Sequence, residues 1–172
     1  MVEQARGRGV NAKLARAEAL PFKDGWFERA LLVLVIHVLD RERAFAQLQR
    51  VLAADGRVVL ATFDREQFDG GYLAPYFPSL VEIDRARFPA SDELRAELDA
   101  AGFDSRWLRR TQTASYRREG TIERVRNRFI STLQLLPELE FEEGLRRLER
   151  ELPEHVEARQ HWLLGFAVRR PL

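Results

Sequence analysis

The 172-residue sequence contains no cysteine, and this absence excludes disulfide bonds, cysteine-ligated zinc and thiol catalysis. It also lacks a long apolar run: Ala30 to Leu39 is the most apolar stretch and is too short to span a bilayer, which takes roughly 18 residues. The first residues, M-V-E-Q-A-R-G, lack the apolar centre of a signal peptide. We therefore expect a cytoplasmic protein with no membrane partner.

A strong charge of either sign is missing as well, since the formal net charge is +1 at pH 7. Nucleic-acid binding normally needs a clustered basic surface, so we expect no nucleic-acid partner. Eight arginines do gather in residues 106–128, but acidic residues in 138–157 offset them, and we interpret both as solvated helix faces. With 45% hydrophobic residues, no repeats and no linkers, the chain is predicted to form a single domain over residues 1–172.

The first 63 residues alternate between predicted helices and strands. A helix over residues 2–8, closed by Gly7 or Gly9, precedes a short alternating strand over residues 12–17. Continuous apolar runs at residues 30–36 and 57–63 are typical of strands that are buried on both faces. Between them, Asp40 is placed to cap a helix. This β-α-β order predicts an open parallel sheet.

The second half is less regular. Residues 64–90 are rich in glycine, proline and aromatic residues and are predicted to form a cap or loop with one short helical turn. A helix is expected from its N-cap Ser91 to residue 101, closed by Gly102, and a strand over residues 103–116. Two amphipathic helices, at 118–136 and 140–156, are separated at Pro137, and a last strand follows at residues 157–169.

One stretch carries family information. Residues 17–28 read A-E-A-L-P-F-K-D-G-W-F-E and run into the first apolar strand. This order resembles the class I S-adenosylmethionine-dependent methyltransferases, in the type 11-like branch that reads A-E-x-L-P-F-x-D-x-x-F-D. The resemblance is specific over residues 1–63 and rests on element order beyond them.

The resemblance implies an α/β fold with a Rossmann-like open sheet, in which six strands are parallel and the last is antiparallel. Residues 12–17, 30–36, 57–63, 103–116 and 161–169 would be its third to seventh strands. The helices at 118–156 would be a two-helix insertion before the last strand. The first two strands, with the glycine-rich loop that holds the cofactor, are expected to be missing.

Without those two strands, the third strand would be orphaned and the fourth would become a bare apolar edge. Three interpretations stay open. The chain is a truncated methyltransferase, or a homodimer covers the exposed sheet edge, or the fold is rearranged and binds something else.

The resemblance also implies where S-adenosylmethionine binds. Arg16 and Ala17 occupy the place of an Asp-Ala pair that contacts the adenine, and Arg16 lacks the acceptor that an aspartate would offer. Glu18 follows this pair. The end of the fourth strand, with Val33, Leu34 and His37, would lie along the methionine part of the cofactor. For His37, an ordinary histidine at a strand end is an equally good interpretation.

Tyr72, Tyr76 and Phe77 lie in the segment that caps the pocket in relatives and are the candidates for binding an apolar or aromatic substrate. The alternative is that these aromatic rings pack on their own core. Asp64 and Glu66 are the best-placed carboxylates for a general base, with solvated loop charges as the alternative. No catalytic residue is identified.

The three histidines of the chain, His37, His155 and His161, show no metal-ligand spacing, so no metal is expected. Together these features predict S-adenosylmethionine-dependent methyl transfer to a small-molecule substrate. The alternative is a non-catalytic, dimerising remnant of such an enzyme that serves as an interaction module.

Overall fold

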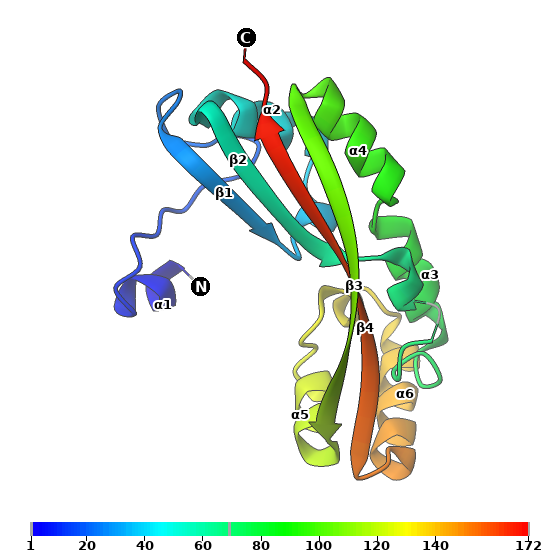
Figure 1. Cartoon of the computed structure of the whole chain (residues 1–172). Coiled ribbons are helices and arrows are strands. Elements are labelled where there is room, and N and C mark those ends of the chain that lie inside the picture. The colour runs from blue at the N-terminus through cyan, green and yellow to red at the C-terminus, as the bar shows by residue number, and fades with distance from the viewer. Residues whose placement is uncertain (1, 69, 172) are drawn as a thin grey trace.

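A computed structural model describes residues 2–68 and 70–171 and contains one four-stranded sheet, flanked by helices (Figure 1). The strand order is β1-β2-β4-β3. β1 (Phe27–Val33) and β2 (Leu52–Phe63) are parallel, whereas β4 (His155–Arg169) is antiparallel to both of its neighbours, β2 and β3 (Phe103–Arg117). The predicted α/β open sheet with an antiparallel last strand is therefore confirmed.

β1 and β2 are joined by helix α2 (Arg41–Val51), as the alternation of runs predicted. Asp40 caps this helix, because its carboxylate accepts a 3.3 Å hydrogen bond from the backbone N–H of Arg43. β1 begins three residues earlier and ends three residues earlier than predicted, since Leu34 has a positive φ of 51° and turns the chain out of the strand. Ile36 lies beyond the end of the strand but is buried in the core, which explains why the apolar run extends to it.

The predicted strand over residues 12–17 is wrong. The structure has only an isolated bridge there, between Arg16 and Ala19. A strand is stable only beside another strand, and no described strand lies on the outer side of β1. Residues 12–17 thus have no ladder to join.

The segment from 64 to 90 is more helical than predicted. After a 3₁₀ turn at Arg65–Phe68, it contains the ten-residue helix α3 (Pro78–Arg87). Pro78 is the first helical residue, where its missing N–H costs nothing, so this proline begins a helix rather than a loop. Ser91 was predicted to be the N-cap of α4 (Ser91–Ala100). In the structure Ser91 is the first helical residue, and Ala90 is the N-cap.

The remaining helices follow the predicted order with shorter bounds. α1 (Val2–Gly7) precedes Gly9, whose φ of 79° fits the expected helix-ending role. α5 (Arg118–Arg126) ends early and is followed by a 3₁₀ turn at Ser131–Gln134, and α6 (Glu138–Glu151) begins directly after Pro137. Within the described residues, no helix is long and apolar enough to cross a membrane.

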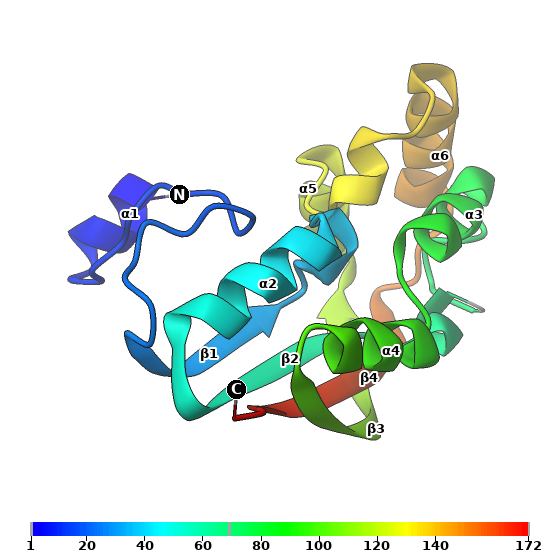
Figure 2. The ribbon, with the colours of Figure 1, turned by 90° about the horizontal axis from the view of Figure 1, so that it is seen from above.

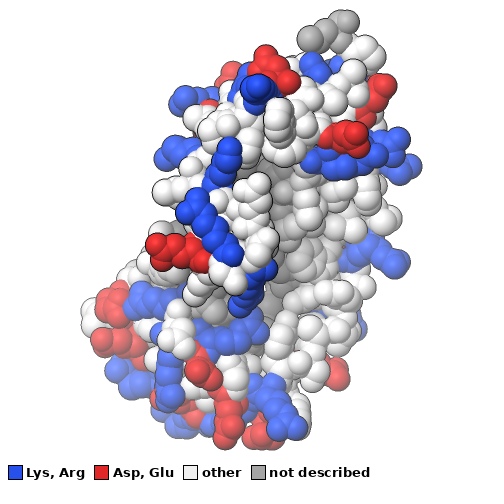
Figure 3. All heavy atoms as spheres, turned by 90° about the vertical axis from the view of Figure 1, so that its left-hand side faces the viewer, with Lys and Arg blue, Asp and Glu red and all other residues white. Residues whose placement is uncertain are grey.

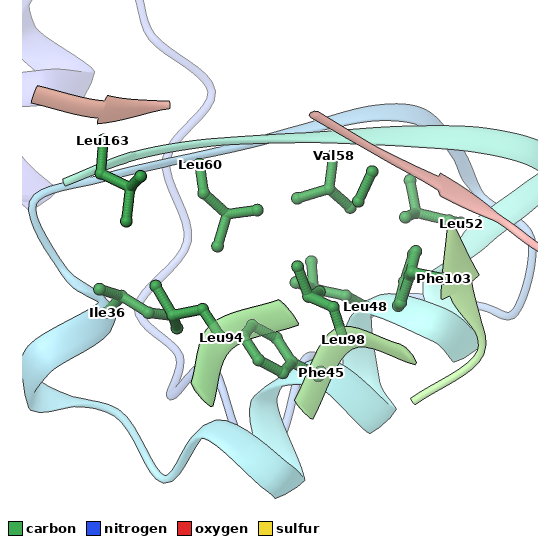
Figure 4. Packing of buried hydrophobic residues seen from close by; sticks show 11 residues of the cluster. Ile36, Phe45, Leu48, Leu52, Val58, Leu60, Leu94, Leu98, Phe103 and Leu163 are labelled. Carbon is green, nitrogen blue, oxygen red and sulfur yellow. The ribbon is translucent and has the colours of Figure 1, made fainter. Parts of the chain in front are cut away.

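The described residues form two hydrophobic cores. In the first, α2 and α4 cover one face of the sheet, and Phe45, Leu94 and Leu98 pack against Val58 and Leu60 of β2 (Figures 2 and 4). The second lies where β3 and β4 extend beyond β1 and β2 as a two-stranded ribbon. It is built by α3, α5 and α6 around the ribbon (Figure 1).

Candidate functional site

The site predicted for the cofactor lies at the carboxyl ends of β1 and β2. Because these strands are parallel, their ends meet at one edge of the sheet, the place where open α/β sheets bind ligands. The Leu34 N–H donates to the carbonyl of Ala61 at 2.8 Å, which fixes the exit from β1 beside β2. The chain then enters the 3₁₀ turn Ile36–Val38, which carries His37.

His37 is half-buried in an aromatic group at this end of the sheet. Its ring stacks on Phe88 with centroids 4.1 Å apart, and Phe88 in turn contacts Phe68 at 4.7 Å. Burial, helped by the nearby Arg87 guanidinium, lowers the pKa of His37 to about 4. The imidazole is therefore neutral near pH 7. Its Nδ1 atom is buried and has no hydrogen-bond partner among the described residues.

Glu18 ties the predicted adenine-binding segment to the same junction. Its carboxylate accepts a 3.1 Å hydrogen bond from the backbone N–H of Asp40, three residues beyond His37. Hydrogen bonds from backbone N–H groups, its own first and then that of Asp40, lower the pKa of Glu18. Arg16 lies 3.4 Å from the Glu18 carboxylate and is largely exposed. Ala17 is in the turn that the Arg16–Ala19 bridge closes. The structure thus brings Arg16, Ala17 and Glu18 to the turn that follows β1.

The two candidate bases have other partners. Asp64 is buried and forms a 2.5 Å ion pair with Nε of Arg109, which links the end of β2 to β3 and raises the pKa of Arg109. The Glu66 carboxylate lies 3.7 Å from Nδ1 of His161 on β4. Asp64 is therefore placed to hold two strands together.

The three predicted substrate residues belong to the second core instead. Phe77 is fully buried and stacks on Phe141, with ring centroids 6.0 Å apart. Tyr72 packs 5.9 Å from Tyr116, and burial raises its pKa. Tyr76 packs against the same core. In this structure Phe77 faces no open surface, so packing on their own core is the better interpretation of these rings.

Two further polar groups near this end of the sheet were not predicted as site residues. Thr62 of β2 and Trp162 of β4 each have a buried polar atom, Oγ1 and Nε1, without a partner among the described residues. Phe63 packs against Trp162 with centroids 4.7 Å apart. Thr62 could have been predicted from the sequence, because its hydroxyl group stands within the apolar run 57–63.

The donor set tests how well a cofactor fits. The adenine part of S-adenosylmethionine needs backbone and apolar contacts, and its methionine part needs polar contacts. The turn at Arg16–Glu18 and the unpartnered Nδ1 of His37 offer both at one junction. In residues 2–68 and 70–171, no strand leads through a glycine-rich turn directly into a helix. The described residues therefore fit one side of a nucleoside cofactor. None of them forms a group of three acidic or histidine side chains that could hold a metal.

Comparison with known proteins points to one family. Residues 1–60 match the family model described as a methyltransferase domain. The chain is 33% identical to demethylmenaquinone methyltransferase of Thermus thermophilus, over 60% of the chain and 56% of that protein. It is 37% identical to malonyl-[acyl-carrier protein] O-methyltransferase of Geobacter sulfurreducens, over 61% of the chain and 43% of that protein. The chain thus spans about half the length of these curated relatives.

A solved structure supports the fold. A protein of Anabaena variabilis, assigned as a methyltransferase of an antibiotic biosynthesis pathway, superimposes with a TM-score of 0.65. The match covers 90% of this chain and 72% of that one, at 23% identity. At this identity the likeness concerns the fold alone.

Proposed function

Because this chain belongs to the class I methyltransferases, we propose that it takes part in the transfer of a methyl group from S-adenosylmethionine to a small-molecule substrate. The observation that carries the proposal is the junction after β1. There, the family motif at residues 17–28 and the turn that carries His37 are joined by the Glu18–Asp40 hydrogen bond. When bound, the cofactor supplies an electrophilic methyl group on a sulfonium.

The residues of the chain would bind and orient this cofactor. The turn at Arg16–Glu18 would contact the adenine through its backbone, and Val33, Leu34 and His37 would border the methionine part. A neutral His37 adds no positive charge beside a sulfonium cation, which favours its binding. The acceptors of the two named relatives differ, so we propose a small organic acceptor without specifying it.

Calorimetric titration with S-adenosylmethionine tests the proposal. We expect saturable binding by the chain, weakened about tenfold by His37→Ala, which removes the polar group at the junction. The matched control is His155→Ala, at the exposed start of β4, which we expect to bind as the unaltered chain does. Absence of binding by the unaltered chain, or equal loss in both variants, would overturn the cofactor assignment.

A second candidate function has its own observation. β1 is an edge strand whose outer side pairs with no described strand, and such an edge is a template for pairing with another copy. We therefore also propose a homodimer that covers this edge and serves as an interaction module without catalysis. Sedimentation would show a dimer, and the β1 amides would exchange hydrogen slowly in the dimer only. A monomer at every concentration tested would contradict it.

A further inference from the structure

A cluster of polar side chains lies at the end of α3, at the level where β3 and β4 leave the sheet (Figure 1). Asp84 accepts a hydrogen bond from the Thr132 hydroxyl, and these two residues are only 5% and 3% exposed. Arg87, the last residue of α3, donates to the same Thr132 oxygen at 3.0 Å and to the Ser131 hydroxyl at 3.0 Å. We call these four residues the Arg87 cluster.

Hydroxyl groups, and not a carboxylate, hold the guanidinium of Arg87. Both of its hydrogen bonds to the described residues end on hydroxyl oxygens. Thr132 gives its own proton to Asp84, so its oxygen accepts from Arg87. A guanidinium has five N–H donors in a planar fork, and the two hydroxyls use only two of them. The cluster therefore orients the fork and leaves donors for an anionic group.

Other arginines near the second core are arranged differently. On the side shown in Figure 3, basic and acidic side chains are interspersed over the lower part of the molecule, which holds this core. Arg126 lies 2.8 Å from the Glu149 carboxylate, and Arg128 lies 2.6 Å from that of Glu138. Their charges are thus balanced locally. Arg87 is half-buried and bonds directly to no carboxylate among the described residues.

The Arg87 cluster borders the proposed cofactor site. Phe88 follows Arg87 and stacks on His37, with ring centroids 4.1 Å apart. The Arg87 guanidinium is near enough to His37 for its charge to help lower the pKa of that imidazole. We proposed above that His37 borders the methionine part of S-adenosylmethionine, which carries the methyl group. A methyl acceptor has to lie beside that part for the transfer, and Arg87 lies at the same junction.

We propose that Arg87 binds an anionic group of the methyl acceptor, so that the acceptor is a small organic oxyanion, either a carboxylate or a phosphate ester. A planar guanidinium pairs with two oxygens of either group through parallel N–H bonds. Arg87 would thus bind the substrate, whereas Thr132 and Asp84 would position Arg87. The inference rests on the proposed function. The alternative is that Arg87 only stabilises the end of α3, where a cation interacts favourably with the helix dipole.

Titration of the full chain with three probes, followed by NMR in the presence of S-adenosylmethionine, tests the inference. The probes are benzoate, phenyl phosphate and the neutral benzamide. We expect benzoate or phenyl phosphate to bind about tenfold more tightly than benzamide, and the tighter of the two identifies the anionic group. A nuclear Overhauser effect between the ring of that probe and the methyl group on the sulfonium should show that they are neighbours. Equal binding of all three probes, or oxyanion binding without this effect, would overturn the inference.

Variants identify the residue that binds the oxyanion. Arg87→Gln should abolish the preference over benzamide, and Arg87→Lys should keep part of it, because lysine retains the charge and loses the fork. Thr132→Val removes the hydroxyl that orients the guanidinium, and we expect it to weaken oxyanion binding but not benzamide binding. Arg126→Gln, at an exposed position on α5, is the matched control and should bind all probes as the unaltered chain does. A preference that survives in Arg87→Gln, or an equal loss in Arg126→Gln, would contradict the inference.

Calorimetry with S-adenosylmethionine separates this inference from the proposed function. Arg87→Gln should bind the cofactor as the unaltered chain does, because Arg87 is assigned to the acceptor. Intact cofactor binding without a preference for oxyanions would overturn the inference alone. Absence of cofactor binding by the unaltered chain, with oxyanion binding through Arg87 retained, would overturn the proposed function and with it the assignment of the oxyanion as methyl acceptor. Unchanged far-UV circular dichroism would confirm that each variant is folded.

Discussion

His37 makes the stability of the protein depend on pH. Its pKa is about 4 in the folded chain, against 6.5 for an unperturbed histidine. Between these values the unfolded chain binds a proton that the folded chain does not. The free energy of unfolding therefore falls as the pH is lowered from about 6.5 to about 4.

Urea unfolding at pH 7 and pH 5 measures this effect. We expect His37→Phe, which retains a ring to stack on Phe88, to lose less stability on acidification than the unaltered chain. His155→Gln is the control, since this histidine is exposed, and it should show the full loss. A His37→Phe variant that loses as much stability as the unaltered chain would show that His37 is not the group responsible.

Some individual residues were predictable and others were not. Asp40 was found as an N-cap because a helix start depends on a few neighbouring residues. The pairing of Asp64 with Arg109 was not, because 45 residues separate them and only the packing of β2, β4 and β3 brings them together. Core packing of Phe77 was an open alternative, but its partner could not be named from the sequence, because Phe141 comes from a distant helix.

The contact between α6 and the residues just before α3 depends on a glycine. A Cβ atom at Gly144 would lie 2.4 Å from the Phe77 ring and 2.5 Å from the backbone oxygen of Tyr76. Gly144→Ala should therefore destabilise the protein by about 1–3 kcal/mol through overpacking, even though alanine favours the helix. Chemical denaturation measures the change.

Gly120 in α5 provides the matched helical control. A Cβ atom there would meet nothing within 4 Å, so Gly120→Ala should stabilise the protein by about 0.5–1 kcal/mol. Opposite signs for the two substitutions are expected. If both variants were stabilised, the close packing of Gly144 on Tyr76 and Phe77 would be incorrect.

Among the elements, those that long apolar runs or clear caps signal were predicted best. β2, β3, β4 and α2 all appear where the sequence placed them, with shifted ends. The strand at residues 12–17 was wrong because alternation alone does not supply a neighbouring strand. Helix α3 was missed because its proline was read as a loop signal, whereas Pro78 occupies the first helical position.

The two cores are connected by the continuous ladder of β3 and β4, which pairs over fifteen residues. Leu98 in the first core and Leu148 in the second are both fully buried. Leu98→Ala and Leu148→Ala should each cost about 2–5 kcal/mol and lower the same single unfolding transition. Circular dichroism with denaturant tests this. Two separate transitions, each sensitive to one variant, would show that the ladder does not couple the cores.

The three tryptophans lie in different parts of the sheet, so that their fluorescence can be used to follow each part separately. Trp26 is exposed just before the edge strand, and Trp162 packs on Phe63. Trp107 lies across Gly165 on the face that α2 and α4 cover, where a Cβ atom would come within 2.6 Å of its ring. Replacing any two of them by phenylalanine would leave a single fluorescent tryptophan. The wavelength of its emission maximum during unfolding would then show whether the edge, the ribbon or the covered face is exposed to solvent first.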